Sequence, residues 1–174
     1  MGIVPTFHGI RVAEIWAMTS FVPRAYPNRI PAIEGARPRG LAELKALCAG
    51  LASSGGAAMF RLGGAPAGAE RMEVAEAEIR EVFERLSASE EPDAALLGCP
   101  HLSAFELKSL ARAVSGRKLK RKLIICSFER AVREATSAVA SLRVSGAYVV
   151  CGACAVTPPI LRDLGVECVI TDSA

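Results

Sequence analysis

The sequence from Leu97 to Ser103 reads LGCPHLS, and a second stretch with two cysteines, CGAC, runs from Cys151 to Cys154. Each stretch follows a short apolar run and comes just before a pattern that starts a helix. Short apolar strands that alternate with helices favour a parallel sheet covered by helices on both faces. In such a sheet, ligands gather at the carboxyl ends of the strands. We therefore expect both cysteine stretches to face the same edge of one sheet.

The rest of the chain fits this alternation of strands and helices. Apolar residues recur at helical spacing from Leu41 and stop at the SSGG turn of residues 53–56. A buried strand over residues 57–62 and a helix over 73–86 follow. The remaining strands are expected at 93–98, 122–127, 146–150 and 167–171, and the remaining helices at 103–114, 129–142 and 158–164. Ser103 and Glu106 have the spacing of a capping box. The prediction is a three-layer α/β fold with a mostly parallel sheet.

The sequence also predicts where the domain begins. Residues 1–40 contain five prolines and few signals for regular structure, so we interpret them as an irregular lead-in from a preceding domain. Residues 41–174 are expected to form one α/β domain.

Composition and charge exclude several classes of protein. The net charge of +3 in 174 residues is too small for nucleic acid to be the main partner, and the aromatic content of 5% offers few surfaces for base stacking. The one dense basic run, residues 117–122, is interpreted as a solvated connector, with a phosphate or polyanion contact as the alternative. The chain has no membrane span and no export signal, so we expect a soluble, cytoplasmic protein whose six cysteines are thiols or ligands.

Spacing alone leaves the chemistry of the cysteines open. A two-residue spacing, as between Cys151 and Cys154, serves redox pairs, zinc sites and iron–sulfur sites alike. Cys99 next to His101 is compatible with a nucleophile and its base, although adjacent residues rarely face each other, and a ligand cysteine with a polar neighbour is preferred. Cys126, at another strand end, is expected to face the same cleft. Cys48 and Cys168 are expected to be core residues, and His8 a loop residue.

Five segments resemble the aconitase X family: LAELKALCAGLASSGG (41–56), AAMF (57–60), LGCPHLS (97–103), CAVTP (154–158) and TDS (171–173). The resemblance implies an aconitase-like fold and a hydro-lyase that holds an iron–sulfur cluster, of the 4Fe–4S type, on three cysteines. By position, Cys99 and Cys154 are two of the three cluster ligands. His101 and Cys151 are expected beside the cluster, and Ser173 is a positional candidate for a catalytic residue.

The resemblance also implies a substrate and partners. Archaeal members dehydrate mevalonate 5-phosphate to an anhydromevalonate phosphate in isoprenoid synthesis, and bacterial relatives dehydrate cis-3-hydroxyproline. A small swivelling subunit or domain closes the site in the family. A small phosphorylated hydroxy acid is the expected substrate, and no nucleic acid or membrane is expected as a partner.

Departures from the family pattern limit what this chain is expected to do alone. The first cluster cysteine belongs to an N-terminal portion of the large subunit that the 174 residues lack, and the family continues beyond Ser173 to a substrate-binding lysine. Gly152 and Ala153 precede Cys154 where relatives have Asp-Thr or Asp-Ser, and Arg61 follows Phe60 where many have histidine. We expect a fragment that is inactive by itself. The alternatives are a non-catalytic remnant or assembly module, a hydroxyproline dehydratase relative, and a redox protein that uses Cys151 and Cys154.

Overall fold

The computed structural model describes residues 30–35, 37–55, 57–71, 73–86, 91–154 and 158–171. The chain divides into two compact units, one of Met1–Ala88 with Ala174 and one of Ser89–Ser173. This division falls inside the stretch 41–174 that the sequence assigns to one domain. Most of the expected lead-in, as well as His8 and Ser173, lies outside the described residues.

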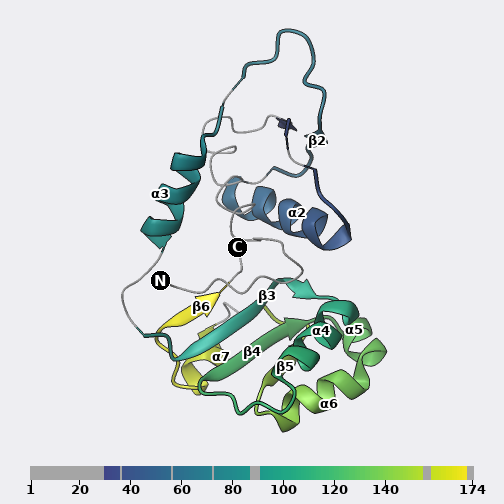
Figure 1. The fold of residues 1–174 in the computed structure, drawn as a ribbon, viewed down its shortest axis with the longest axis vertical. Helices are drawn as coiled ribbons and strands as arrows, with labels where there is room; N and C mark the ends of the chain where they lie inside the picture. The colour runs from purple at the N-terminus through teal and green to yellow at the C-terminus, as the bar shows by residue number, and fades with distance from the viewer. Residues whose placement is uncertain are drawn as a thin grey trace. The chain divides into compact units, whose positions relative to one another are not determined.

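The described residues of the first unit form two short parallel strands and two helices (Figure 1). They are β1 (Ala32–Ile33), α2 (Leu41–Gly55), β2 (Arg61–Leu62) and α3 (Glu76–Leu86), and β1 pairs with β2. Ile33 and the α2 residues Leu47 and Leu51 form a small core, against which Ala57 and Phe60 pack. This unit thus has apolar packing of its own.

Two expectations for the first unit are wrong. The strand over residues 57–62 is only Arg61–Leu62, and both residues are exposed, because Ala57 and Phe60 reach the core from a loop instead. Cys48 is exposed. The buried face of α2 instead includes the carboxylate of Glu43, which accepts hydrogen bonds from the backbone N and the Nε of Arg39 at 2.6 and 2.9 Å. Because its charge is paired, Glu43 can lie where an apolar residue was expected.

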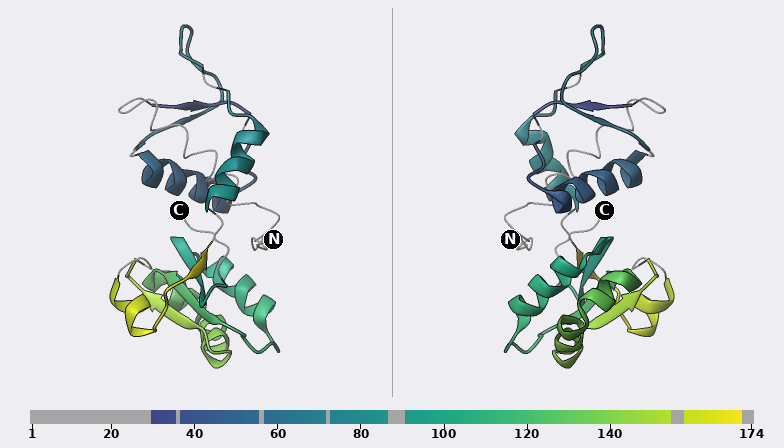
Figure 2. Two further views of the ribbon diagram at one scale, coloured as in Figure 1. Left: turned by 90° about the vertical axis from the view of Figure 1, so that its left-hand side faces the viewer. Right: turned by 90° about the vertical axis from the view of Figure 1, so that its right-hand side faces the viewer.

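The second unit is a four-stranded parallel sheet between helices, which confirms the predicted α/β fold. Its elements, in chain order, are β3 (Ala94–Leu102), α4 (Ala104–Val114), β4 (Lys122–Ser127), α5 (Glu129–Glu134), α6 (Thr136–Val144), β5 (Tyr148–Cys151), α7 (Pro158–Asp163) and β6 (Val169–Thr171). Helices α4, α5 and α6 lie on one side of the sheet and α7 on the other (Figures 1 and 2). Together they make three layers.

Alternating residues of the central strands supply both faces of the sheet. Ala94 and Leu96 of β3 pack with Ile124 and Cys126 of β4, and Leu161 of α7 covers this group. The intervening residues, such as Leu97 and Ile125, are also buried. A strand that is apolar on both faces is typical of a parallel sheet inside an α/β domain. The continuous apolar runs in the sequence have this origin.

Among the second unit's elements, only β4 has the predicted bounds, and the largest differences are in the helix after β4 and in β3. The helix expected over 129–142 is two helices, because Ala135 leaves the helical conformation with φ −121° and ψ 30°. Strand β3 continues to Leu102 instead of ending at residue 98. The capping box is confirmed, since the Ser103 side chain accepts from the Glu106 N–H and the Glu106 carboxylate accepts from the Ser103 N–H.

Within the described part of the chain, no helix is both long and apolar enough to cross a membrane.

Candidate functional site

The strand order β5-β4-β3-β6 places the candidate site at a topological switch point, where successive connections leave β3 on opposite sides. From β3 the chain proceeds through α4 to β4 and then to β5, but through α7 it returns to pair β6 with the opposite side of β3. Ligands of open α/β sheets bind outside the carboxyl ends of the strands at such a switch point. The carboxyl end of β3 is where LGCPHLS lies.

A bulge in β3 presents Cys99 at this edge. The β3–β4 pairing is regular as far as Leu97 opposite Ile125 and resumes with Leu102 opposite Ser127. Four residues, Gly98 to His101, therefore stand against Cys126 alone. The extra residues leave the plane of the ladder, as in any bulge, and bulges commonly redirect a side chain near a functional site.

Both ends of the bulge are fixed by contacts with β4. At its start, Gly98 has φ +119°, and a Cβ built there would lie 2.3 Å from the Cys126 carbonyl oxygen. Only glycine fits a backbone at this distance. At its end, the buried Ser127 hydroxyl donates to the Leu102 carbonyl at 2.6 Å. The Cys99–Pro100 peptide bond within the bulge is cis.

The loop after β5 reaches the same edge. Gly152, with φ +67°, turns the chain, and its N–H donates to the Ser127 carbonyl at 3.2 Å. His101 contacts the next residue, with 3.0 Å between its Nε2 and the Ala153 carbonyl oxygen. Because a carbonyl oxygen only accepts, Nε2 is the protonated nitrogen. His101 thus ties the bulge that carries Cys99 to the loop that carries Cys154.

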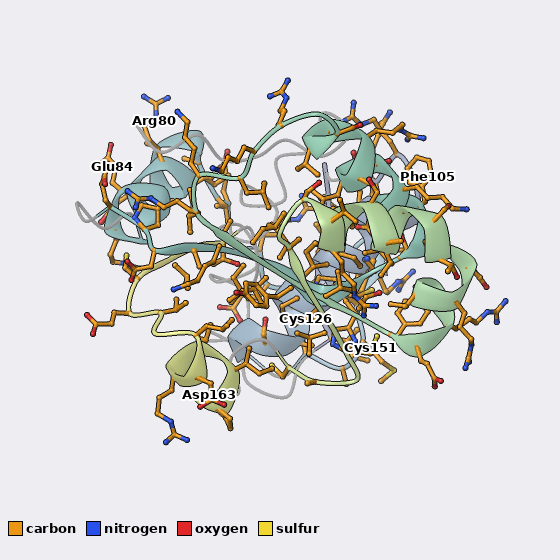
Figure 3. The ribbon with its side chains drawn as sticks, turned by 90° about the horizontal axis from the view of Figure 1, so that it is seen from below. Arg80, Glu84, Phe105, Cys126, Cys151 and Asp163 are labelled. Carbon is orange, nitrogen blue, oxygen red and sulfur yellow. The ribbon has the colours of Figure 1, made fainter. Side chains whose placement is uncertain are left out.

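Four cysteines, Cys99, Cys126, Cys151 and Cys154, lie on the strands and loops that the His101–Ala153 hydrogen bond connects. Cys126 is buried on β4, and Cys151 follows on the neighbouring strand β5, where it pairs with Ser127 (Figure 3). Burial raises the pKa of the Cys126 thiol, and the charges of Cys154, Cys99 and Cys151, in that order, raise it further. The other three thiols therefore lie within electrostatic reach of Cys126. Contrary to the sequence prediction, Cys126 itself does not face a cleft, because it is buried in the core with Ala94, Leu96 and Ile124.

These thiols differ in exposure. Cys99 is half-buried, whereas Cys151 and Cys154 are exposed, and none of the six cysteines, all of which the structure describes, is in a disulfide. Cys168, which the sequence predicts to be a core residue, is only half-buried. Thiolates are soft ligands that suit iron–sulfur clusters, so the donor chemistry of Cys99 and Cys154 fits such a group. Among the described residues, no three His, Cys, Asp or Glu side chains form a set that could hold a metal ion. The two cysteines fit as part of a ligand set, not as a complete one.

The sequence reasoning missed the residues that hold the site together. Ser127, whose hydroxyl anchors Leu102, has no sequence signal that marks this role, and neither does the partner of His101, which is a backbone carbonyl. Asp93, at the opposite end of β3 from the cysteines, was also missed: its carboxylate accepts from the N–H groups of Glu167 and Cys168, both at 3.0 Å, and so fixes the start of β6 beside β3. The glycine directly before Cys99 was the available signal for the bulge.

The fold and the site therefore define one class of structure. It is a doubly wound α/β unit with a cysteine site at its switch point. The model of the aconitase X third domain matches residues 92–174, and that of the aconitase X second domain matches residues 9–91. The chain belongs to the aconitase X family. The boundary between the two matches, at 91/92, lies close to the boundary between the two structural units.

Named relatives agree with this assignment. The chain is 31% identical over 153 residues to the phosphomevalonate dehydratase large subunit of Methanosarcina mazei, and 33% identical over 143 residues to that of Methanocaldococcus jannaschii. The matches cover 84% and 75% of this chain but only 38% and 35% of those proteins. The chain thus spans little more than a third of the length of these relatives.

A solved structure shares the fold. The crystal structure of Thermococcus kodakaraensis aconitase X in its holo-form superposes with a TM-score of 0.76 at 23% sequence identity. The superposition covers 93% of this chain and 45% of that one.

Proposed function

We propose that this chain is part of an iron–sulfur hydro-lyase, in which Cys99 and Cys154 are two of three cluster ligands. The observation that carries the proposal is the pairing of the β3 bulge with the β5 loop through the His101–Ala153 hydrogen bond. That contact brings two accessible thiols from distant parts of the sequence to the switch point of one sheet. The third cysteine ligand lies outside this chain, which accords with the incomplete ligand set of the described residues.

Each side chain of the site has a distinct role in this proposal. Cys99 and Cys154 hold the cluster, and His101 keeps their two segments together while Cys151 lies beside them. When bound, the cluster supplies an open iron that acts as a Lewis acid on a substrate hydroxyl. Cys126 is buried with a raised pKa, so it stays a neutral thiol behind the site. Ser173 is the candidate catalytic residue by position in the family.

The proposed substrate is mevalonate 5-phosphate, dehydrated to an anhydromevalonate phosphate in isoprenoid synthesis. The names of the relatives that match at 31–33% identity support this choice over hydroxyproline. Because those relatives are large subunits, a small swivelling subunit is the proposed partner, together with the part of the large subunit that carries the first cysteine. The isolated chain is expected to be inactive.

A second candidate is a non-catalytic module that keeps the fold without the reaction. The incomplete ligand set among the described residues is compatible with this candidate as well as with the enzyme, and the departures from the family pattern at Gly152 and Ala153 motivate it. The two candidates differ in whether added partner chains restore a cluster.

Reconstitution with iron and sulfide tests the enzyme proposal. We expect this chain, mixed with the N-terminal portion and small subunit of a relative, to bind iron and to dehydrate mevalonate 5-phosphate. Cys99→Ser and Cys154→Ser should each lower the bound iron and the visible absorbance of the cluster. Cys48→Ser is the matched control, because Cys48 is an exposed thiol of the other unit.

Two results would decide against the proposal. Equal loss of iron in the control and in the site variants would mean that binding is nonspecific. Absence of cluster absorbance and of turnover with every partner chain would leave the non-catalytic module.

A further inference from the structure

Two cysteines of the candidate site lie within one four-residue segment at the end of β5. Cys151 is the last residue of β5, Cys154 follows after two residues, and both are exposed. The chain bends at the two intervening residues, Gly152 and Ala153. Gly152 has φ +67°, in the left-handed region that favours glycine. The segment therefore turns at this point and does not continue the strand.

The bend is held from two sides by main-chain contacts. The Gly152 N–H donates to the Ser127 carbonyl of β4 at 3.2 Å. The Ala153 carbonyl oxygen accepts from Nε2 of His101, in the β3 bulge, at 3.0 Å. Neither contact involves a sulfur atom, so both can persist while the chemistry of the two thiols changes. Because the bend is fixed by folding, little further entropy is lost when the two cysteines are joined.

The spacing of the two cysteines suits a bond between their sulfur atoms. A fully extended chain places the Cα atoms of residues three positions apart at most about 11 Å from each other, and the two bends shorten this distance. A disulfide requires Cα atoms about 4.4–6.8 Å apart. Among the other cysteines of the site, Cys99 is half-buried and Cys126 is buried. Cys151 is thus the exposed partner closest to Cys154 along the chain.

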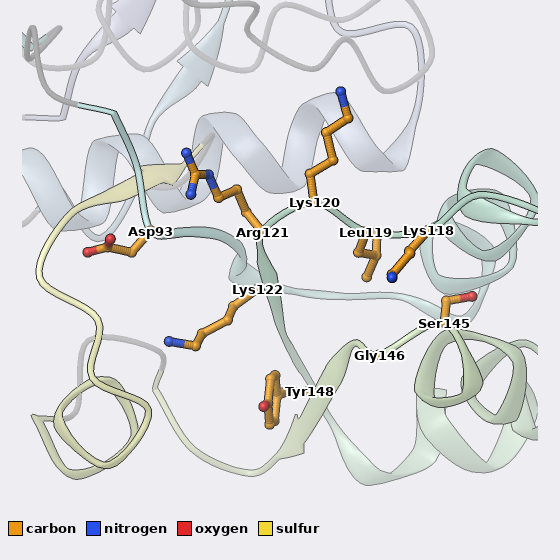
Figure 4. A pocket seen from close by; sticks show the side chains of 9 residues that line it. All are labelled: Asp93, Lys118, Leu119, Lys120, Arg121, Lys122, Ser145, Gly146 and Tyr148. Carbon is orange, nitrogen blue, oxygen red and sulfur yellow. The ribbon is translucent and has the colours of Figure 1, made fainter.

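The opposite end of β5 has a different character. Tyr148, the first residue of the strand, lines a hollow together with Lys118, Lys122 and other residues (Figure 4). No cysteine lines this hollow. The thiol pair lies at the other end of the strand, where both cysteines are exposed. A small molecule can therefore reach the pair without entering the hollow.

We propose that Cys151 and Cys154 form a disulfide when no cluster is bound, by exchange with a low-molecular-weight disulfide of the glutathione class. One thiol, as its thiolate, attacks a sulfur of glutathione disulfide, whose S–S bond breaks and releases one glutathione. The other thiol attacks the resulting mixed disulfide, which closes the bond between Cys151 and Cys154 and releases the second glutathione. Two electrons and two protons pass from the protein thiols to the two glutathione molecules.

This disulfide makes the segment a redox switch for the cluster, a consequence that rests on the proposed function. Cys154 is a proposed ligand, and a cysteine must be a thiolate to bind iron. Oxidation therefore removes Cys154 from the ligand set, and reduction returns it. Cys151, which is not a proposed ligand, is the partner that keeps Cys154 from irreversible oxidation to sulfinic or sulfonic acid.

Mass spectrometry of tryptic peptides tests the disulfide independently of the cluster. The full chain is equilibrated with an excess of glutathione disulfide over glutathione, quenched with acid and alkylated with N-ethylmaleimide. Cleavage after Arg143 and Arg162 releases peptide 144–162, which contains Cys151 and Cys154 and no other cysteine. We expect most of this peptide to escape alkylation and to be lighter than the reduced peptide by two hydrogen atoms. After reduction with dithiothreitol, it should be alkylated twice.

Cysteine variants identify the bond. Cys151→Ser and Cys154→Ser should each abolish the loss of two hydrogen atoms from peptide 144–162. Cys48→Ser is the matched control and should leave the oxidised fraction unchanged, because Cys48 is an exposed thiol of the other unit. The proposal would be overturned if peptide 144–162 of the parent were alkylated twice or carried only glutathione, or if either cysteine were joined to Cys99.

Iron loading distinguishes this proposal from the proposed function. With the partner chains present, the oxidised chain should bind less iron than the reduced chain, and dithiothreitol should restore the difference. Absence of iron from the reduced chain, or equal iron in both forms, would refute Cys154 as a ligand. The disulfide would still be decided by peptide 144–162 alone.

Discussion

Replacing Gly98 with alanine should destabilise the second unit more than any other glycine substitution in its loops. The new Cβ would lie 2.3 Å from the Cys126 carbonyl oxygen and 2.8 Å from its nitrogen. Both atoms belong to the backbone of a central strand, paired on both sides, so neither can move without breaking the ladder. Overpacking of this kind costs about 1–3 kcal/mol, and the positive φ adds about 1–2 kcal/mol. The expected loss in the free energy of unfolding is therefore about 2–5 kcal/mol.

Urea unfolding followed by circular dichroism measures this loss. Because the two units can unfold separately, hydrogen exchange at the amides of β3 and β4 should accompany it. Gly116→Ala is the matched control: Gly116 has φ +69°, but a Cβ there meets no atom within 4 Å. Gly116→Ala should lower the free energy of unfolding only by the cost of a positive φ for alanine, about 1–2 kcal/mol. Equal losses in the two variants would refute the argument that contact with Cys126 demands glycine.

Three smaller changes test other contacts. Ser127→Ala should cost about 1–2 kcal/mol in urea unfolding, because the buried Leu102 carbonyl loses its hydroxyl donor, and a loss within error would show that this bond adds nothing. Ser103→Ala removes the N-cap of α4 and should cost about 1 kcal/mol, whereas Ser103→Asp should retain most of the stability. The hydrogen bond from the Arg39 backbone, more than its charge, holds the pKa of Glu43 below 4.5. The stability that this carboxylate contributes is therefore complete above pH 4.5 and is lost as the pH falls through its lowered pKa. Glu43→Gln should be less stable than the parent at pH 7, with a difference that shrinks in urea titrations below pH 4.5; a constant difference would contradict this.

The second unit was well predicted from the sequence because its signals are local. The strand over residues 122–127 has the predicted bounds, since an uninterrupted apolar run fits only a strand buried on both faces. The start of α4 followed from the capping box, which depends on two residues three positions apart. The α/β class followed from the alternation of such elements.

What the sequence did not reveal depends on contacts between distant residues. The length of β3 beyond residue 98 is set by the return of Leu102 to Ser127, and no pattern within LGCPHLS indicates that partner. The break at Ala135 has neither glycine nor proline to mark it. Cys48 was wrongly placed in the core because helical spacing alone does not specify which side of α2 faces it. The buried side contains Glu43, a charged residue that would normally indicate an exposed position.

For the candidate site, the sequence brought Cys99, Cys126 and the Cys151–Cys154 stretch to one edge by topology alone. The strand order and the charges acting on Cys126 agree with that grouping. The assignment of Cys99 and Cys154 as ligands rests on the family resemblance and remains a prediction. The link through His101 could not be foreseen, because its partner is a main-chain oxygen that every residue possesses.

The anchoring of the β3 bulge has a consequence for how this segment can change in evolution or in the laboratory. Gly98 and Leu102 are each held against β4, so the number of residues between them is fixed even where their identities are not. Substitution of Cys99 or His101 would alter the chemistry presented at the sheet edge while leaving the contacts of Gly98 and Leu102 with β4 in place. Deletion or insertion of a single residue would instead force one anchor out of position. The segment therefore has a fixed length, and libraries that vary the side chain at position 99 without changing that length are the natural route to new ligands at this edge.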